Sequence, residues 1–507
     1  MSNNPIEPAR FLVDASAAGR RMSRSWEFAV GSGDAWSILR ADLQGQLRRA
    51  VRECGFRYLR CHGILCDQLQ AVRRDREGNL VYNWQLVDAV YDALLEIGLR
   101  PFVELGFMPT ALASGEQAVF FYRANVTPPA DYAAWNAFIA ALVTHWRERY
   151  GAEELRQWYF EVWNEANLRG FWSSTRDEYF RLYAETAATI KAVDPTLPVG
   201  GPATSRGEWL PEFMAWCRER GVPVDFVSTH IYPDDDDFEK VDPGYRETFN
   251  HGSYLETLVG RAAGSLRDER PIGAEGRLEA HWTEWNSSWR WGRPIHDLTN
   301  QAAYICRAVH GIHERVDSFA FWAISDIFNE FPYPRAAFVG GFGLITIDGL
   351  AKPGYHAYTL LHRLGDVEIP ALREDSVATD TQAGSLDCWA TRSGSACQIL
   401  LTNYVPPGLE ASPPAQRELV VRLTGLAPDS RWQLTTYRID AEHANPLAAW
   451  LALGSPDSPT PAQLAGLRAA AELRPSEPQQ VQANSRGALS LPTTMLPASV
   501  TFYELLP

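Results

Sequence analysis

The 507-residue sequence lacks long apolar runs and has no surplus of basic charge. No stretch approaches the roughly 20 apolar residues of a membrane-spanning helix, so we expect no membrane partner. The net charge of −15 also disfavours nucleic acid as a partner, because its phosphates would be repelled. The first residues, MSNNPIEPAR, lack the basic segment and apolar core of a signal peptide, which favours the cytoplasm over the periplasm.

Paired cysteines are also missing. The seven cysteines are odd in number and irregular in spacing, which predicts free thiols in a reducing compartment. Cys61 and Cys66 have no matching second pair, so a zinc site is not expected, and nothing in the sequence calls for a cofactor. Aromatic residues are abundant instead, with 18 Trp, 19 Tyr and 22 Phe. Such rings fill cores and also stack against sugars, and composition does not separate these two uses.

Short apolar runs alternate with longer amphipathic stretches from about Trp26 to Thr346. Residues 86–98 and 132–150, for example, carry apolar side chains at the three- and four-residue spacing of helices. Eight strands that alternate with helices predict an α/β fold, a closed parallel (β/α)8 barrel, over residues 16–346. The predicted strands are residues 25–31, 56–63, 100–107, 158–165, 197–203, 225–232, 280–286 and 318–324.

The pattern changes after Leu350, where strand-like runs are separated by Pro, Gly and Ser turns. A second domain over residues 347–507 is therefore predicted to be an antiparallel β-sandwich, with one inserted helix in residues 459–475. The N-terminal residues 1–15 include an extended apolar run that is a candidate for an additional strand of this sandwich. The predicted strands of the second domain are residues 386–392, 397–404, 418–426, 432–440 and 499–506.

Two glutamates stand at the ends of predicted barrel strands, where barrel active sites are built. Glu165 ends the run WYFEVWNE, and Glu284 lies between Trp282 and Trp285. Hydrolysis of a glycoside needs one carboxyl group that donates a proton and one that attacks as an anion. Aromatic surroundings desolvate a carboxyl group and raise its pKa, which suits the acid. A single glutamate at a strand end is usually only solvated or paired with a cation, but two on one barrel favour catalysis.

The segments around these glutamates resemble a known family. WNEANL is similar to the acid/base motif of clan A glycoside hydrolases, and TEWNSSW to the nucleophile motif of glycoside hydrolase family 39, which contains β-xylosidases and α-L-iduronidases. Further similar segments run in order along the chain: RCHGILCD, PFVELGFMPTALASG, NLRGFW, FVSTHIYP, GGFGLITIDGLAKPGYHA and YRIDAEHANPLAAWLALGSP. The resemblance implies that Glu165 is the acid/base and Glu284 the nucleophile. Ala166 stands where the clan usually has proline, a residue that shapes the turn and performs no chemistry.

Other side chains are candidates for substrate binding around the two glutamates. Arg60 and His62 alternate on one predicted strand and therefore face the same side, as do His230 and Tyr232 on another. An arginine near Glu284 would keep it ionised. The resemblance supports these residues and adds five candidates. Asn164 offers a side-chain amide for the sugar 2-hydroxyl, and Trp322 a floor on which the sugar lies. Phe171 and Trp172 are candidate pocket walls, and Glu330 is a candidate acceptor for the outer hydroxyls.

The family's adjacent acidic pair is Asn329–Glu330 here, so only Glu330 carries over. An ionised Glu330 would accept hydrogen bonds from neutral hydroxyls and repel a substrate carboxylate, which favours a neutral sugar. Arg290, Arg293 and Arg335 are the residues that would reverse this preference if they lay in the site.

The resemblance makes a retaining exo-β-1,4-xylosidase that acts on xylo-oligosaccharides the leading hypothesis. A retaining α-L-arabinosidase or α-L-iduronidase-like enzyme on the same site is the nearest alternative. A non-catalytic carbohydrate-binding protein is more remote, because both carboxylates are present. The sequence does not predict the oligomeric state.

Overall fold

Eight parallel strands close into a barrel in the computed structural model, which describes residues 8–234, 254–374, 386–405 and 416–507. Their side chains are mostly buried, as expected for parallel strands that are covered by helices on the outside. The predicted (β/α)8 barrel is thereby confirmed. In order around the barrel the strands are β3 (Ala29–Asp34), β4 (Tyr58–His62), β7 (Arg100–Leu105), β10 (Tyr159–Val162), β11 (Val199–Thr204), β12 (Phe226–Ile231), β13 (Glu279–Trp285) and β14 (Ser318–Phe321).

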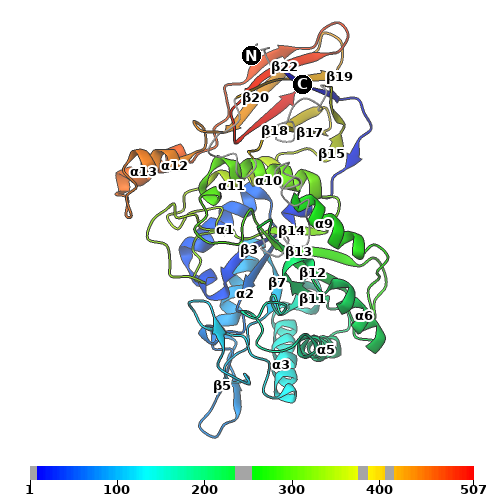
Figure 1. The fold of residues 1–507 in the computed structure, drawn as a ribbon, viewed down its shortest axis with the longest axis vertical. Coiled ribbons are helices and arrows are strands. Elements are labelled where there is room, and N and C mark those ends of the chain that lie inside the picture. Colours follow the sequence, from blue (N-terminus) through cyan, green and yellow to red (C-terminus); the bar gives the residue numbers. More distant parts are fainter. Residues whose placement is uncertain (1–7, 235–253, 375–385, 406–415) are drawn as a thin grey trace, which may run out of the picture.

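Helices surround the barrel (Figure 1), and their ends follow local sequence signals. The Asp131 and Thr175 side chains cap the N-termini of α3 and α5 by accepting backbone N–H bonds. Gly55 and Gly98 end α1 and α2 in the left-handed conformation that glycine adopts at little cost. The helices are α1 (Ala41–Cys54), α2 (Gln85–Ile97), α3 (Tyr132–Tyr150), α4 (Ala152–Leu155), α5 (Arg176–Val193), α6 (Leu210–Arg220), α9 (Tyr254–Ser265), α10 (Thr299–Ile312) and α11 (Pro353–His362).

Two further sheets form the predicted sandwich and enclose their own apolar core. Figure 1 shows the sandwich beside α10 and α11, and α10 packs against β18 and β23. One sheet has the order β16 (Ala371–Arg373), β1 (Ala9–Asp14), β19 (Arg417–Thr424), β22 (Leu489–Met495). The other has the order β2 (Arg20–Arg21), β15 (Val367–Ile369), β17 (Leu386–Ser393), β18 (Ala396–Asn403), β23 (Ser499–Leu506), β20 (Arg431–Ile439), β21 (Gln479–Gln482).

The N-terminal strand β1 lies within the sandwich and pairs with β19 in parallel and with β16 antiparallel. The inserted helical segment consists of α12 (Pro446–Ala452) and α13 (Pro461–Ala470), and it projects beside the barrel in Figure 1. Helix α11 packs against α1 and α10 around the barrel. The division of the chain into domains at residue 346 stays a prediction. Among the described residues, no helix has the length and apolarity to cross a membrane.

Two short hairpins extend the loops of the barrel. They are β5 (Val72–Arg74) with β6 (Leu80–Tyr82), and β8 (Ala118–Val119) with β9 (Ala124–Asn125). The second hairpin carries Phe120, which lines the cavity described next.

Candidate active site

Glu165 and Glu284 lie together at the carboxyl-terminal end of the barrel. Glu284 is on β13, whereas Glu165 follows β10 in a left-handed conformation with φ 47°. Its backbone N–H donates to the carbonyl oxygen of Ala203 at 2.8 Å, which ties it to the end of β11. The two strands are not neighbours in the barrel, yet a carboxylate oxygen of each glutamate lies within 4.8 Å of the other.

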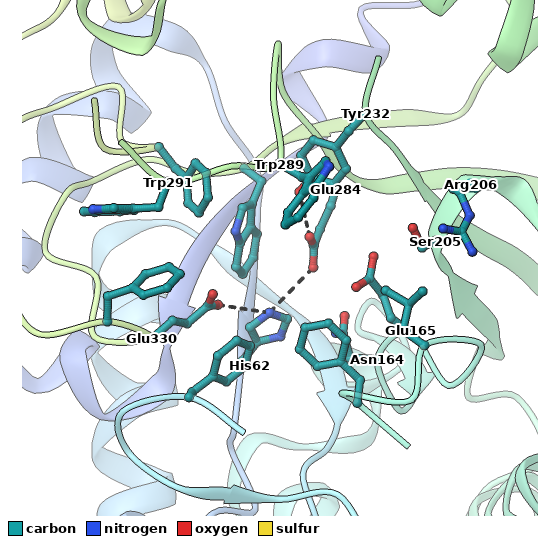
Figure 2. A pocket seen from close by; sticks show the side chains of 16 residues that line it. His62, Asn164, Glu165, Ser205, Arg206, Tyr232, Glu284, Trp289, Trp291 and Glu330 are labelled. Atoms are coloured by element: carbon teal, nitrogen blue, oxygen red, sulfur yellow. Dashed lines mark hydrogen bonds and ion pairs between the residues drawn. The ribbon is translucent and has the colours of Figure 1, made fainter. Parts of the chain in front are cut away.

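Both glutamates face a cavity of about 450 Å³ whose wall is largely aromatic. Figure 2 shows their carboxyl groups pointing toward each other across it. Much of the wall comes from loops that follow the barrel strands, as the fold requires. The described lining residues are His62, Phe120, Asn164, Glu165, Leu168, Phe171, Ser205, Arg206, Tyr232, Glu284, Trp289, Trp291, Trp322, Glu330, Phe331 and Phe342.

Arg60 lies beneath the two glutamates and is fully buried. Its guanidinium donates to Glu161 Oε2 at 2.6 Å, Glu284 Oε1 at 2.8 Å and Asn164 Oδ1 at 2.9 Å. A carboxylate oxygen of Glu104 is also 2.9 Å away. Burial lowers the pKa of Arg60, but the surrounding carboxylates outweigh that effect and raise it above its ordinary value. The cation is therefore permanent, and it contacts the Glu284 carboxyl group directly.

Tyr232 completes the surroundings of Glu284. Its hydroxyl donates to Glu284 Oε2 at 2.8 Å, so each carboxylate oxygen of Glu284 accepts one hydrogen bond, the other from Arg60. Burial, followed by the charges of Glu284 and Glu165, raises the pKa of Tyr232 well above its ordinary value, so this hydroxyl keeps its proton. These two hydrogen bonds orient the Glu284 carboxyl group at the cavity.

The surroundings of Glu165 differ from those of Glu284, because they raise the pKa of its carboxyl group. Burial raises its pKa to about 7, although the positive charges of Arg60 and Arg206 act against this. A hydrogen bond of 2.9 Å joins Glu165 Oε1 to His230 Nδ1. Burial lowers the pKa of His230 to about 4, so the imidazole is neutral near pH 7. A carboxyl group with a raised pKa, close to a second one that accepts hydrogen bonds from a cation and a hydroxyl, is the arrangement expected of an acid and a nucleophile.

His62 and Glu330 form the end of the cavity away from Glu165. His62 Nε2 lies 3.6 Å from Glu284 Oε1 and 3.4 Å from Glu330 Oε1, and its Nδ1 is bonded to Glu104. Burial, with the charges of Glu284 and Glu165, raises the pKa of Glu330 well above that of an ordinary carboxyl. Burial thus acts against the ionised form that the sequence analysis expects, and the role of Glu330 as a partner of sugar hydroxyls stays a prediction.

Trp322 forms part of the cavity wall directly after β14, and its ring centroid lies 4.6 Å from that of His62. Gly31 leaves room for this indole, since a Cβ atom there would lie 2.4 Å from Trp322 Cε3. Phe171 lines the cavity as expected. The expectation for Trp172 is corrected, because its ring packs edge-on against Trp163 behind the wall. Its indole N–H donates to the Thr175 carbonyl instead.

Several residues of the site were missed from the sequence. Glu104 and Glu161 are buried acids on β7 and β10. A charged residue within an otherwise apolar strand was the sequence feature that could have indicated them. Arg60 and His230 were expected to bind substrate, but neither is among the lining residues and both contact the glutamates instead. The wall residues that loops contribute were not singled out, although Trp289 and Phe342 lie within the similar segments quoted above: Ser205, Arg206, Trp289, Trp291, Phe331 and Phe342.

A barrel with a close pair of carboxyl groups in contrasting surroundings, at an aromatic cavity, defines the class of glycoside hydrolases. Residues 9–489 match the model of the glycosyl hydrolases family 39, and the chain belongs to this family.

Relatives of known description agree with this assignment. A β-xylosidase from Caldicellulosiruptor saccharolyticus is 37% identical over 459 residues, which are 90% of each chain. One from Geobacillus stearothermophilus is 35% identical over 97% of this chain and 95% of its own length. The crystal structure of a monomeric β-xylosidase from Caulobacter crescentus CB15 superposes with a TM-score of 0.84 at 34% identity, covering 98% of this chain and 99% of that one.

Proposed function

We propose that the protein is a retaining exo-β-1,4-xylosidase, with Glu284 as nucleophile and Glu165 as acid/base. The observation that carries this proposal is the approach of the two carboxylate oxygens to within 4.8 Å. Retaining enzymes have carboxyl groups about 5–5.5 Å apart, whereas inverting enzymes need roughly 6.5–9.5 Å to admit a water molecule. The contrasting surroundings of the two side chains then assign the roles.

In the first step Glu284 Oε attacks the anomeric carbon of the terminal sugar. The bond from that carbon to the glycosidic oxygen breaks, and Glu165 gives its proton to this oxygen. In the second step Glu165, now ionised, takes a proton from water, and the water oxygen displaces Glu284 from the anomeric carbon. Two displacements restore the original configuration. Arg60 and Tyr232 hold Glu284 in place for both steps, while Asn164, fixed by Arg60, is the proposed partner of the sugar 2-hydroxyl.

The described surroundings favour a neutral terminal sugar. The end of the cavity at His62 and Glu330 is formed by buried side chains, with further carboxyl groups of Glu104 and Glu161 behind it. A substrate carboxylate placed there would lose its hydration, and none of the described residues that line this end of the cavity is an arginine or a lysine. Because buried side chains close this end, the cavity has room for only the end of a saccharide chain there. This supports release of one terminal sugar at a time. The relatives described as β-xylosidases support xylose as that residue.

An α-L-arabinosidase or an α-L-iduronidase-like enzyme is the alternative on the same machinery. Arg290, Arg293 and Arg335, which were to decide between neutral and acidic sugars, are not among the described residues that line the cavity. Arg335, for example, is paired with Asp457 at the surface, and its side chain is 85% exposed. The described part of the site therefore favours the neutral sugar. The cytoplasmic location stays a prediction.

The test compares 4-nitrophenyl β-D-xyloside with the corresponding α-L-arabinosides and an α-L-iduronide. Wild type is assayed beside Glu284→Gly and Glu165→Ala, each with and without azide. We expect the highest wild-type kcat/KM on the xyloside and large losses in both variants. Azide should give α-xylosyl azide with Glu284→Gly and β-xylosyl azide with Glu165→Ala.

The outcomes separate mechanism from substrate. Azide rescue with the same stereochemistry on another sugar would keep the two glutamates and reject the xylosidase assignment. Variants as active as wild type would reject the assignment of the glutamates. Gly45→Ala serves as the control variant, because the added methyl group meets nothing within 4 Å on the exposed part of α1.

A further inference from the structure

His62 has carboxyl groups on both sides of its ring. Its Nδ1 lies 2.5 Å from Glu104 Oε2, and its Nε2 lies 3.6 Å from Glu284 Oε1 and 3.4 Å from Glu330 Oε1. Figure 2 shows the ring between the carboxyl groups of Glu284 and Glu330. Burial lowers the pKa of His62 to about 3, so the ring is neutral near pH 7 and carries a single N–H. The position of this proton decides what His62 offers to a bound sugar.

One arginine serves three buried carboxyl groups next to His62. Among the described residues, the ion pairs of Glu104, Glu161 and Glu284 with arginine or lysine are all made by Arg60. Burying an ionised carboxylate without a compensating charge is costly. A single cation does not balance three buried anions, so a proton on one of the three groups is favoured.

The contacts of these groups favour Glu104 as the one that carries the proton. Both oxygens of Glu161 accept hydrogen bonds, one from Arg60 at 2.6 Å and one from a threonine hydroxyl at 2.9 Å. The contacts of Glu104 with Arg60 and His62 instead meet at one oxygen, Oε2. A protonated Oε2 accepts from Arg60 and donates to His62 Nδ1 at the same time. Burial also raises the pKa of Glu104 to about 8, although the charge of Arg60 acts against this.

The Nε2 end of the ring supports the same arrangement. Under the proposed function Glu284 attacks as an anion, and its Oε1 is one of the two carboxyl oxygens beside Nε2. An N–H at Nε2 is attracted to that anion, whereas a lone pair at Nε2 would be repelled by it. If Nε2 carries the proton of the neutral ring, Nδ1 is an acceptor and its partner Glu104 is the donor.

We infer that Glu104 is a positioning residue: its carboxyl group keeps a proton and donates a hydrogen bond to His62 Nδ1, which fixes the Nε2–H tautomer of His62. This inference rests on the proposed function. His62 lines the cavity, so its Nε2–H is a donor for a hydroxyl group of the terminal sugar. Glu104 is buried and is not among the described residues that line the cavity, so it acts through His62. The two residues lie on the neighbouring strands β7 and β4, which holds their contact in place.

The opposite tautomer gives Glu104 a different role. An ionised Glu104 would accept from Nδ1–H of His62 and would serve as a counter-ion of Arg60. A protonated Glu330 would then donate to Nε2, and His62 would offer a lone pair to the sugar. The proton on the ring of His62 therefore separates the two roles.

Two other buried histidines provide standards for this measurement. His296 Nδ1 lies 2.9 Å from the Gly340 carbonyl oxygen, and His356 Nε2 lies 2.6 Å from the Ala471 carbonyl oxygen. A carbonyl oxygen only accepts, so the proton is on Nδ1 in His296 and on Nε2 in His356. Burial lowers the pKa of each ring to about 4, so both are neutral near pH 7.

The first experiment records NMR spectra of the whole protein, labelled with nitrogen-15 in its histidine rings, near pH 7 and without substrate. The signals of the three histidines are identified by their loss in His62→Gln, His296→Gln and His356→Gln. We expect His62 to show the pattern of His356, with a protonated Nε2 and an unprotonated Nδ1. The pattern of His296, or a ring with both nitrogens protonated, would overturn the inference. Because no substrate is present, failure of the proposed function does not produce either result.

The second experiment compares kcat and KM of Glu104→Gln and Glu104→Met with wild type on xylobiose and 4-nitrophenyl β-D-xyloside. The glutamine amide is neutral and still donates to Nδ1, so Glu104→Gln should lose less than about threefold in kcat/KM and keep the wild-type NMR pattern of His62. Methionine has no donor, so Glu104→Met should lose about tenfold, the effect of one hydrogen bond. The loss should be equal on both substrates, because they share the terminal xylose.

The kinetic outcomes separate a hydrogen-bond donor from a counter-ion. Equal losses in Glu104→Gln and Glu104→Met would overturn the inference, because they would show that the negative charge of Glu104 is needed. Wild-type kinetics in Glu104→Met would also overturn it. Glu96→Met, at a side chain that is 76% exposed, is the matched control and should keep the wild-type values. Thermal melting identifies a variant that fails to fold, and the wild-type spectrum then decides. If wild type hydrolyses another glycone, the proposed function fails and the comparison is repeated with that glycone.

Discussion

The pKa of Glu165 sets the pH range in which the enzyme works. Burial raises it from an ordinary value of 4.5 to about 7, which corresponds to about 3 kcal/mol of disfavoured ionisation. Only the protonated acid starts the first step, so kcat/KM on xylobiose should fall about tenfold per pH unit above pH 7. At pH 9 it should be about a hundredfold below the plateau. Burial lowers the pKa values of His62 and His230 to about 3 and about 4, so neither produces this decline.

The assay records kcat/KM between pH 5 and 9 on xylobiose and on 2,4-dinitrophenyl β-D-xyloside. Dinitrophenolate leaves without a proton, so the decline above pH 7 should be absent on that substrate. Glu165→Gln should lose most activity on xylobiose and should retain the first step on the dinitrophenyl xyloside. A decline at the same pH on both substrates, or one that persists in Glu165→Gln, would refute the reasoning and assign the titration to another group.

Three further predictions concern stability and packing. Because the folded-state pKa of Glu165 is raised, its stabilising contribution is complete below about pH 4.5 and is lost as the pH rises through 7. Glu165→Gln should therefore exceed wild type in free energy of unfolding by up to about 3 kcal/mol at pH 8, measured in urea, and the reverse order would contradict this. Arg60→Met leaves several buried carboxylates without their cation. It should lower the free energy of unfolding in urea by about 3–5 kcal/mol or more, and a decrease below about 1 kcal/mol would contradict this. Gly31→Ala should displace Trp322 and lower kcat/KM on the xyloside about tenfold or more, while the circular dichroism spectrum stays unchanged. The control Gly45→Ala should keep the wild-type kcat/KM. Equal activity of the two variants would reject Trp322 as the sugar-binding floor.

The barrel was predictable because its strands and helices have different periods. Apolar and β-branched runs such as residues 158–165 are typical of strands buried on both faces, and residues 132–150 have helical spacing. The short strands β15, β16 and β21 escaped prediction, since they contain only three or four residues. Pro492 within β22 likewise weakened the strand pattern of residues 489–495.

The candidate site was predictable where residues sit on strands. Arg60 and His62, or His230 and Tyr232, share a face because strand side chains alternate, and the structure brings all four to the glutamates. Loop residues such as Arg206 have no such periodicity, so their place in the cavity depends on tertiary contacts. The raised pKa of Glu330 was not predictable either, because it depends on burial among other carboxyl groups.

The close pair of glutamates acting by double displacement is the central claim. An activated 2-deoxy-2-fluoro-β-D-xyloside, which slows the second step, should trap the glycosyl-enzyme intermediate. Digestion and mass spectrometry should then locate one fluoroxylosyl group per chain on Glu284, and Glu284→Gln should acquire none. A label on Glu165, or no label together with a product of inverted configuration, would contradict the account.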